Sequence, residues 1–565
     1  MLPALRKQID RARLVVRAVH STGVVQPVRP SALVGFARGA LRLRFGPHLA
    51  VMYQAAAHPD REALVEYGAT GVHRMTWSQL DATINRLANA LIARGVRRGS
   101  GVALMLPNGR EYLIAQQALA KLGATAVQIG YRLKAAEIAY ILGNAEPRAT
   151  LVHVDHLDAM LAARAQAGRS GPAGGPMIVV GAHTAAAGDP ELAEWDRALA
   201  EVSPDVPALP PGGPADQGDQ GGMIVYTSGT TGRSKGAHRS WRTVGIESVA
   251  DLLVQVGMRA DDRHLVVCPL YHSAAPAFVA MMFVLGATVV LMNHFDPAGA
   301  LEIIERERIT CSMMVPTMIV RITNLPGDAL ARHDTRSLRW VMSAAAPLST
   351  EAARRFMDRF GPILWNFYGA TETGLVTLAG PGDHLTRPGT IGRALHGNEI
   401  RLVDEAGRDV PDGQVGELYA RNAMLISGYH KNAEATRSSQ LGGFFSVGDL
   451  GRRDADGYYY LESRKHDMVI SGGVNIYPRE IEDHLHKHPA ILDAAVVGDP
   501  DPEWGETLHA FIVRRDGHAL SEDEVIAYCR EGLADFKRPR KVTFLAELPR
   551  NPTGKVLKRE LRQGA

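Results

Sequence analysis

A loop rich in glycine and hydroxyl side chains occupies residues 226–237, and it constrains the fold of this chain more than any other segment. The run reads Tyr-Thr-Ser-Gly-Thr-Thr-Gly-Arg-Ser-Lys-Gly-Ala, and the apolar residues 223–226 predict a strand that leads into it. Glycines let backbone N–H groups turn inward, hydroxyls donate hydrogen bonds, and the two cations neutralise negative charge. Lys235 is followed by glycine, which excludes a Walker loop. The segment predicts a polyphosphate-binding loop, and a flexible linker is the weaker interpretation because apolar segments lie on both sides.

The size and composition of the chain indicate a globular protein with several domains. A chain of 565 residues exceeds what one hydrophobic core holds, so two or more domains are expected. The composition, 46% hydrophobic and 22% charged, is ordinary, and a net charge of +3 argues against a nucleic-acid partner. The cysteines show neither metal nor redox spacing, which fits a cytoplasmic protein; they are Cys268, Cys311 and Cys529.

The N-terminal leader, residues 1–46, is strongly basic. Residues 1–44 contain nine Lys or Arg and one acid, Asp10, with apolar residues between them. Such a segment can lie on an anionic membrane, which would place the protein peripherally on the inner face of the membrane. The alternative is a solvated helix that packs on the main body or on a partner subunit, as in a homodimer. Arg13 and Arg17 interrupt any apolar core, so no secretory signal is expected.

Residues 274–292 carry no charge and just reach the length that raises the question of a membrane span. Pro276 and Gly286 interrupt this stretch, and residues 288–291 are mostly β-branched. We therefore expect a buried helix of about ten residues, a glycine turn and a buried strand, and no transmembrane helix.

Local patterns predict alternating helices and strands. Thr76 and Gln79 form a capping box, and leucine and isoleucine recur at helical spacing up to Gly95. Short apolar runs at 102–106 and 124–129 predict buried strands. This alternation indicates βαβ units and a mostly parallel sheet, as in an α/β fold.

Further motifs follow the phosphate loop in a fixed order. Residues 366–374 read Asn-Phe-Tyr-Gly-Ala-Thr-Glu-Thr-Gly, residues 444–449 end in Asp449, and residues 548–555 end in Gly-Lys. Together these segments resemble the adenylate-forming superfamily of acyl-CoA synthetases, luciferases and peptide-synthetase adenylation domains, most of all bacterial fatty acid–CoA ligases. Several motifs in one order make the resemblance specific, whereas one motif alone would be a hypothesis.

The resemblance implies two domains after the leader. A large N-terminal domain of layered α/β subdomains plus a distorted β-barrel is expected over residues 47–465. A small mobile C-terminal α+β domain, residues 466–565, would follow a hinge at residues 463–467. His466 stands where relatives usually have Asp or Lys as the pivot, and a histidine there titrates near neutral pH.

The resemblance also implies which residues bind ATP and Mg²⁺. Tyr368 would stack on adenine and Thr371 would lie at the α-phosphate. Glu372 would be catalytic by holding magnesium, which takes one or two carboxylates beside phosphate oxygens. Ala344 and Ala345 stand in an adenine loop where glycine is usual in relatives. The other nucleotide positions are Thr227, Ser228, Gly229, Thr230, Thr231, Gly232 and Lys235 for phosphate, with Asp449 and Arg464 for ribose or phosphate.

Two further motifs would carry the two half-reactions. Lys555 resembles the adenylation lysine, whose ammonium binds the carboxylate and the α-phosphate and stabilises the charge that develops during attack. Thr227 and His272 are assigned to the catalytic set with it. Gly472 and Gly473 resemble the loop that borders the pantetheine channel of coenzyme A, where missing side chains leave a narrow path.

The same resemblance favours an apolar acid as substrate. Residues 269–273, expected to line the acyl pocket, contain no aspartate to hold an ammonium group, so an α-amino acid is not expected. Gly369 stands where acetate-activating relatives carry a tryptophan, which would leave the channel open. Each buried methylene contributes only about 0.8 kcal/mol, so neighbouring chain lengths are poorly distinguished. Expected wall residues are Phe278, Met281, Met313, Val315, Met318, Leu375 and Val376.

The three histidines at 484, 486 and 488 could suggest a metal site. They are interpreted instead as part of a surface helix that begins at Pro478 and ends before Pro489, because no other motif lies nearby.

These inferences predict an AMP-forming carboxylic acid–CoA ligase for medium- to long-chain fatty acids, working through an acyl-adenylate with ATP, Mg²⁺ and coenzyme A. One alternative passes the adenylate to a carrier-protein phosphopantetheine, and another is an aryl-acid–CoA ligase. A third, of a different class, is a non-catalytic adenylate-binding protein at a membrane. Lys555 and Glu372 argue against that third alternative, because a binding module needs neither.

Overall fold

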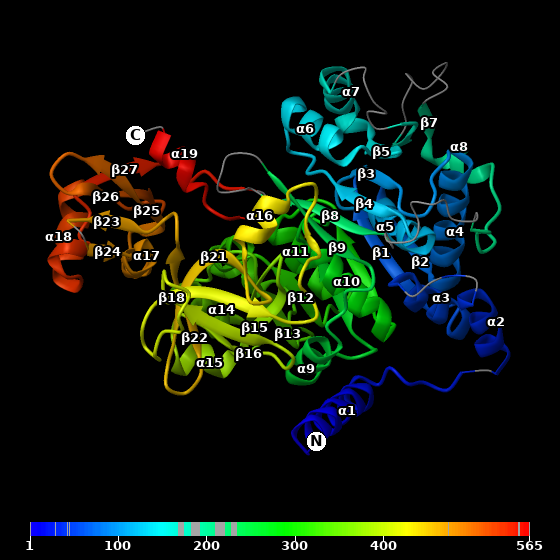
Figure 1. Cartoon of the computed structure of the whole chain (residues 1–565), viewed down its shortest axis with the longest axis horizontal. Coiled ribbons are helices and arrows are strands. Elements are labelled where there is room, and N and C mark those ends of the chain that lie inside the picture. The colour runs from blue at the N-terminus through cyan, green and yellow to red at the C-terminus, as the bar shows by residue number, and fades with distance from the viewer. Residues whose placement is uncertain are drawn as a thin grey trace. The chain divides into compact units, whose positions relative to one another are not determined.

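The computed structural model describes residues 2–28, 30–41, 43, 46–167, 175–181, 192–209, 221–227, 234–472, 474–551 and 554–563. The chain divides into two compact units, whose helices and strands are labelled in Figure 1. The first comprises residues 1–313, 327–339 and 423–438, and the second comprises 314–326, 340–422 and 439–565. Both mix helices with sheets, which confirms the α/β class. Among the described residues, none of the helices combines the length and apolar character needed to span a bilayer. The boundaries predicted after residues 46 and 465 stay predictions.

The predicted phosphate-loop strand lies in an eight-stranded sheet of the first unit. The strands, in spatial order, are β19 (Gly428–Tyr429), β9 (Lys235–Ser240), β8 (Gly222–Thr227), β4 (Thr125–Gln128), β3 (Gly101–Met105), β5 (Ala149–His153), β6 (Met177–Val180) and β7 (Leu192–Glu194). From β8 to β7 neighbouring strands are parallel, whereas β9 is antiparallel to both β8 and β19. This confirms the mostly parallel sheet and the strands expected at 102–106, 124–129 and 223–226.

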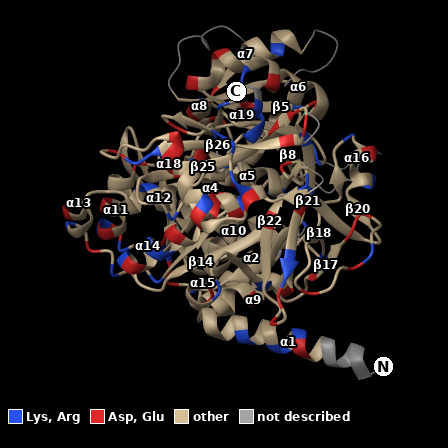
Figure 2. Ribbon diagram, turned by 90° about the vertical axis from the view of Figure 1, so that its left-hand side faces the viewer, with Lys and Arg blue, Asp and Glu red and all other residues tan. Residues whose placement is uncertain are grey.

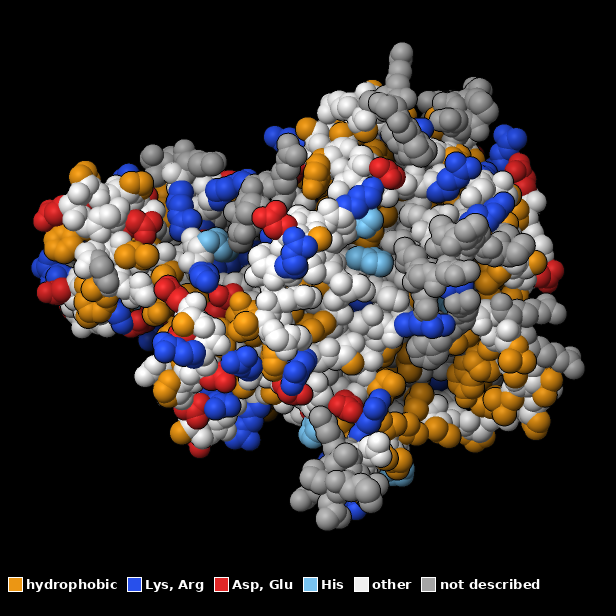
Figure 3. Space-filling model, viewed as in Figure 1, with side chains coloured by type: hydrophobic (Ala, Val, Ile, Leu, Met, Phe, Trp, Pro, Cys, Tyr) orange, Lys and Arg blue, Asp and Glu red, His pale blue; other side chains and the backbone are white. Residues whose placement is uncertain are grey.

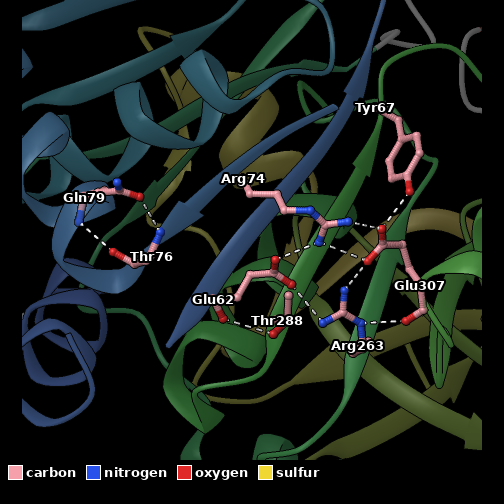
Figure 4. A network of polar contacts seen from close by, with 8 residues as sticks. All are labelled: Glu62, Tyr67, Arg74, Thr76, Gln79, Arg263, Thr288 and Glu307. Atoms are coloured by element: carbon pink, nitrogen blue, oxygen red, sulfur yellow. Dashed lines mark hydrogen bonds and ion pairs between the residues drawn. The ribbon is translucent and has the colours of Figure 1, made fainter. Parts of the chain in front are cut away.

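The capping box at Thr76 begins a helix as predicted. The Thr76 hydroxyl accepts from the Gln79 N–H, and the Gln79 side chain accepts from the Thr76 N–H at 2.9 Å (Figure 4). The helix, α4 (Trp77–Ala93), ends before Gly95, whose φ is +82°. Other helices of this unit are α5 (Arg110–Leu122), α6 (Ala135–Ala145), α7 (Leu157–Gln166), α8 (Trp195–Ala200), α11 (Pro297–Arg306), α13 (Gly327–Ala331) and α16 (Ala433–Ser438).

A second group of strands in the first unit contains the uncharged stretch 274–292. Its strands are β12 (Cys311–Met314), β10 (Arg263–Val266), β11 (Thr288–Met292), β1 (Glu62–Gly68) and β2 (Gly71–Thr76), in that spatial order. Residues 274–285 form α10 (Ala274–Leu285), Gly286 turns the chain with φ of +78°, and β11 is fully buried. The helix, glycine turn and strand are thus confirmed.

The leader forms two helices that pack on the first unit. α1 (Leu2–Thr22) lies against α9 (Ile246–Val256), where Arg11 pairs with Glu247 at 3.2 Å. α2 (Pro30–Ala40) packs on α3 (His48–Ala57), with the rings of Phe36 and Tyr53 5.6 Å apart. Figure 2 marks basic residues along α1 in blue on the ribbon. The structure therefore agrees with the alternative in which the leader packs on the main body.

The second unit is built on a largely antiparallel set of strands. In spatial order they are β17 (Glu399–Val403), β18 (Gly416–Arg421), β21 (Phe444–Arg453), β22 (Tyr459–Arg464), β16 (Thr390–Ala394), β15 (Gly374–Ala379), β14 (Leu364–Ala370) and β13 (Trp340–Ser343), with β20 (Gln440–Leu441) beside β21. The helices are α12 (Pro316–Thr323), α14 (Thr350–Phe360) and α15 (Pro381–Thr386). Tyr368, Val376, Ile391, Leu418 and Tyr459 belong to one buried core cluster of this sheet.

The C-terminal part of the second unit is α+β, as expected. Its strands are β24 (Val474–Ile476), β23 (Val469–Ser471), β26 (Gly505–Arg514), β25 (Ile491–Asp501) and β27 (Lys541–Leu545), the last paired with β26. The helices are α17 (Pro478–Leu485), α18 (Glu522–Gly532) and α19 (Lys558–Gln563), and α17 and α18 lie on this sheet (Figure 1).

The prediction that all three histidines lie on one surface helix was wrong for His486 and His488. The helix ends at Leu485, because the chain turns there into β25, so neither His486 nor His488 belongs to it. The ring of His484 stacks on Tyr528, and His486 contacts Asp493.

Candidate active site

The base of the phosphate loop is a β-hairpin of the first unit. Thr227 and Lys235 are paired across β8 and β9, and the Thr227 hydroxyl donates to the Lys235 carbonyl at 3.4 Å. The Lys235 ammonium lies 5.3 Å from the centre of the Tyr429 ring. The loop between the two strands, with Ser228, Gly229, Thr230, Thr231 and Gly232, lies outside the described residues. The hairpin places the two ends of the predicted phosphate loop side by side.

Three residues predicted to bind the nucleoside lie together in the second unit. The Tyr368 hydroxyl donates to Asp449 Oδ2 at 2.8 Å, and Arg464 Nε lies 3.2 Å from Asp449 Oδ1. Asp449 and Arg464 are brought opposite each other by the register of β21 and β22. Burial, then the Asp449 carboxylate, raises the pKa of Tyr368, so its hydroxyl stays protonated. Each carboxylate oxygen has two lone pairs, so Asp449 retains capacity for ribose hydroxyls.

Lys555 lies within electrostatic range of this cluster. Burial, and then the Arg464 guanidinium, lower the pKa of Lys555 to about 8, while Asp449 and Asp467 oppose the change. The backbone of Lys555 is paired with Asn551, whose side chain accepts from the Lys555 N–H at 2.9 Å. The charges of Arg464 and Asp449, both in the predicted nucleotide site, thus act on the predicted adenylation lysine.

Thr371 and Glu372 form the turn of the β14–β15 hairpin. The Ala370 N–H donates to the Thr373 hydroxyl at 3.1 Å, which closes the turn, and Glu372 is buried. Mg²⁺ takes few protein ligands when phosphate oxygens complete its shell, so a single acidic side chain fits the role. The roles of Thr371 and Glu372 stay predictions.

Gly369 is required by the same hairpin, and the open channel expected at this residue stays a prediction. A Cβ atom built at Gly369 would lie 1.9 Å from the carbonyl oxygen of Gly374. No side chain fits there without moving backbone, whatever the substrate. The hairpin backbone therefore favours glycine at residue 369.

The adenine loop contains backbone strain. Ala345 has a φ of +72°, in the left-handed region that costs an alanine about 1–2 kcal/mol, and its side chain is exposed. Ala344 is buried and has no such strain. Residue 345 thus has a backbone conformation that favours glycine, although its side chain is a methyl group.

The loop expected to face the acid contains buried polar rings. Burial, followed by the nearby Arg132 charge, lowers the pKa of His272 to about 4, so the imidazole is neutral. Among the described residues, neither His272 Nε2 nor the Tyr271 hydroxyl has a hydrogen-bond partner, although both atoms are buried. The ring of Tyr131 packs edge-on against Tyr271 at 5.2 Å. Tyr271 lies in the loop 269–273 that the sequence predicts to line the acyl pocket, whereas no signal in the sequence pointed to Tyr131.

Most of the residues expected to line the acyl pocket are buried in the structure. Phe278 packs against the His264 ring, and Val376 belongs to the core cluster around Tyr368. Met313, Val315, Met318 and Leu375 are also buried, and Met281 is partly exposed. These residues fill the cores of their own units, so their contact with an acid stays a prediction.

The pantetheine loop and the hinge lie in the second unit. Gly472 has a φ of +56°, and a Cβ atom there would lie 2.8 Å from the Trp504 ring. Gly473 lies outside the described residues. At the hinge, burial lowers the pKa of His466, and Arg562 donates to its carbonyl at 3.4 Å. The roles of these residues stay predictions.

The chain is similar to known proteins over most of its length. The AMP-binding enzyme family matches residues 51–430, and the AMP-binding enzyme C-terminal domain matches residues 480–555. A feruloyl-CoA synthase of Amycolatopsis sp is 34% identical over 516 residues, covering 89% of this chain and 98% of that protein. The long-chain-fatty-acid–CoA ligase FadD13 of Mycobacterium tuberculosis is 33% identical over 510 residues, covering 90% and 96%. The solved structure of the anthranilate CoA ligase AuaEII with anthranoyl-AMP has a TM-score of 0.81 at 27% identity, covering 92% and 97%.

Proposed function

Because the chain belongs to the AMP-binding enzyme family, we propose that it is an ATP-dependent, AMP-forming ligase that joins an apolar carboxylic acid to coenzyme A. Acid–CoA ligase is the class that its relatives support. The observation that carries the proposal is the position of Lys555 within electrostatic range of the Tyr368–Asp449–Arg464 cluster.

In the first half-reaction, a carboxylate oxygen of the acid attacks the α-phosphorus of ATP, and the bond to the β-phosphate oxygen breaks to release pyrophosphate. Lys555 would bind the acid and the α-phosphate together and stabilise the negative charge that grows on the phosphoryl oxygens. Asp449 would accept hydrogen bonds from the ribose hydroxyls. When bound at Glu372, Mg²⁺ would supply charge neutralisation to the phosphates.

In the second half-reaction, the sulfur of coenzyme A attacks the acyl carbon, and the acyl–oxygen bond to AMP breaks. The backbone around Gly472 would line the path of the pantetheine arm. The neutral His272 would meet the acyl group without adding charge, because its pKa of about 4 keeps it unprotonated at neutral pH.

A pyrophosphate-release screen over short, medium, long and aromatic acids, with and without coenzyme A, tests the proposal. We expect acid-dependent pyrophosphate release, and AMP release that depends on coenzyme A. AMP release that needs an acyl carrier protein instead would favour the carrier-protein ligase. Pyrophosphate exchange that survives in Lys555→Ala would make the catalytic assignment wrong.

For the substrate, we propose medium- to long-chain fatty acids. Support comes from the similarity to a fatty acid–CoA ligase and from the absence of an acidic side chain in residues 269–273. A fatty acid should therefore give the highest kcat/KM in the screen.

An aryl-acid ligase is the second candidate, because Tyr131, Tyr271 and His272 form an aromatic set at the acyl loop. Aromatic rings prefer edge-on or offset contacts with one another, which a planar acid can share. Tyr271→Leu should then lower kcat/KM for aromatic acids more than for fatty acids. Equal losses would remove this support.

We also propose that the leader brings a cytoplasmic enzyme to an anionic membrane. On α1 the apolar Val16 is 67% exposed and lies three residues after an exposed arginine, Arg13. Apolar side chains also gather over the region of α2 and α3 (Figure 3). The double variant Val16→Asp, Val19→Asp should reduce sedimentation with phosphatidylglycerol vesicles, whereas Val284→Asp, at another exposed site, should not. Wild-type protein that stays in the supernatant would reject the proposal, and its sedimentation velocity tests the predicted homodimer.

A further inference from the structure

The loop that carries Lys555 is tied to the C-terminal sheet by an arginine clamp. We propose that Asp493 and Arg550 are positioning residues that fix Lys555 for adenylate formation and have little part in thioester formation. This inference rests on the proposed function, since it assigns a role within the same reaction.

Arg550 makes contacts in two directions. Its Nη2 atom donates to Asp493 Oδ2 at 2.5 Å, and its Nη1 atom donates to the carbonyl oxygen of Gly554, the residue before Lys555. About a quarter of each side chain of the ion pair is exposed, 26% for Arg550 and 25% for Asp493. A guanidinium presents its donors in a rigid fork, so one arginine can hold a carboxylate and a carbonyl at a fixed separation.

Asp493 is itself held on the sheet. It lies at a register shift near the start of β25, and its Oδ1 atom accepts from the Ala494 N–H at 3.0 Å. His486 Nε2 lies 3.4 Å from the same oxygen. Burial would raise the pKa of Asp493, but the contacts with His486 and Arg550 lower it overall, so the carboxylate is ionised. The clamp thus joins the strand to the loop through a charged pair.

The loop is closed locally by other contacts that do not reach the sheet. The Asn551 N–H donates to the Lys555 carbonyl at 2.9 Å, and Arg550 and Val556 form an antiparallel bridge. On either side, Leu548 and Leu561 are buried in a core cluster with strands of the C-terminal sheet. These contacts keep the hairpin formed when the clamp is broken. The clamp additionally fixes the orientation of the hairpin relative to β25. This orientation sets the position of the Lys555 ammonium.

The loop that carries Lys555 lies close to neighbouring residues, so it has little room to shift. Gly554 has a φ of +78°, and a Cβ atom there would lie 2.7 Å from the Thr317 hydroxyl. A misplacement of about 1 Å at a reacting centre can cost roughly 100-fold in rate. Loss of the clamp should therefore slow adenylation by about 10- to 100-fold, with a smaller change in the KM for ATP.

The test separates the two half-reactions. Asp493→Asn keeps the shape of the side chain and removes its charge, and Arg550→Lys keeps the charge and removes the fork. Pyrophosphate formation would be measured in a single turnover, and thioester formation would be measured from supplied acyl-AMP and coenzyme A. Glu480→Gln is the matched control, because it breaks another ion pair of the same C-terminal region, Lys537–Glu480 at 2.7 Å.

We expect slow pyrophosphate formation and near-normal thioester formation for both clamp variants, and near-normal rates in both assays for the control. Equal loss in the two half-reactions, or unchanged adenylation with an intact thermal midpoint, would overturn the inference. If Asp493→Asn does not fold, the rates of the two half-reactions in Arg550→Lys alone test the inference. Wild-type protein that forms no adenylate with any acid refutes the proposed function instead, so the two failures are distinguishable.

Discussion

The buried Glu307 carboxylate should contribute strongly to the stability of the first unit. It follows the C-terminus of α11, its side chain is only 4% exposed, and it accepts from Tyr67 at 2.7 Å and Arg74 at 2.5 Å (Figure 4). It also accepts from Arg263. Glu62 contacts the same two arginines, at 2.7 Å and 2.9 Å. The network joins β1, β2 and β10 to the end of α11.

Glu307→Gln removes the charge and keeps the shape. Breaking a buried ion pair typically costs about 3–5 kcal/mol, because a charge is left without its partner. Here each arginine keeps Glu62, and Arg74 is 48% exposed, so solvent screens part of the loss. We therefore expect about 2–3 kcal/mol, which at roughly 2 °C per kcal/mol lowers the first thermal transition by about 4–6 °C.

The effect should depend on pH in a defined direction. Burial would raise the pKa of Glu307, but hydrogen bonds from Arg74 and Tyr67 lower it below its ordinary value overall. A depressed folded pKa adds stability above the unfolded pKa, and this stability is lost as the pH falls through the folded pKa. The difference between wild type and Glu307→Gln should thus shrink under acidic conditions.

Urea unfolding of both proteins across the acidic range, beside Glu302→Gln, would measure this. Glu302 lies on the same helix and pairs with Arg306 at 3.7 Å with both side chains mostly exposed, so its loss should cost at most about 0.5 kcal/mol. A cost for Glu307→Gln no larger than this control, or a difference that grows as the pH falls, would refute the reasoning.

Three further outcomes are expected. Because the pKa of Lys555 is about 8, kcat/KM for ATP should fall as the pH rises through that value and the ammonium loses its proton. Lys555→Arg should remove this fall. A fall that persists in the variant would assign the titration to another group. Ala345→Gly should raise the free energy of unfolding of the second unit by about 0.5–1 kcal/mol, because it relieves a φ of +72°. Urea unfolding measures this, and a lower free energy of unfolding would contradict the strain. Gly369→Ala should lower both the thermal midpoint and the affinity for ATP, because its Cβ would meet the Gly374 carbonyl. Gly382→Ala, with open space around the added atom, should change neither. A well-folded Gly369→Ala that binds ATP would show that the hairpin backbone can shift to accept the methyl group.

Elements set by neighbouring residues could be predicted from the sequence. The capping box at Thr76, the strand before the phosphate loop, and the helix, turn and strand within 274–292 all depend on local spacing and glycine positions. Composition and motif order were also enough for the α/β class and the family.

Features that depend on strand register could not be predicted in the same way. Tyr368 and Asp449 are separated by 81 positions along the chain, and their hydrogen bond exists because of how β14 and β21 are placed in one sheet. The need for glycine at residue 369 appears only when the Gly374 carbonyl is placed beside it. The end of α17 at Leu485 depends on the pairing of the following strand, which no helical periodicity reveals.

The double role of Tyr368 has a consequence for how enzymes of this kind can diversify. Its ring is part of the apolar interior of the second unit, while its hydroxyl orients the carboxylate expected to hold the sugar. An exchange at this position would disturb the core packing and the hydrogen bond to Asp449 together. Tyr271 and His272 belong to the other unit, and neither the Tyr271 hydroxyl nor His272 Nε2 has a hydrogen-bond partner among the described residues. Exchanges at these two positions would therefore leave the hydrogen bond between Tyr368 and Asp449 intact.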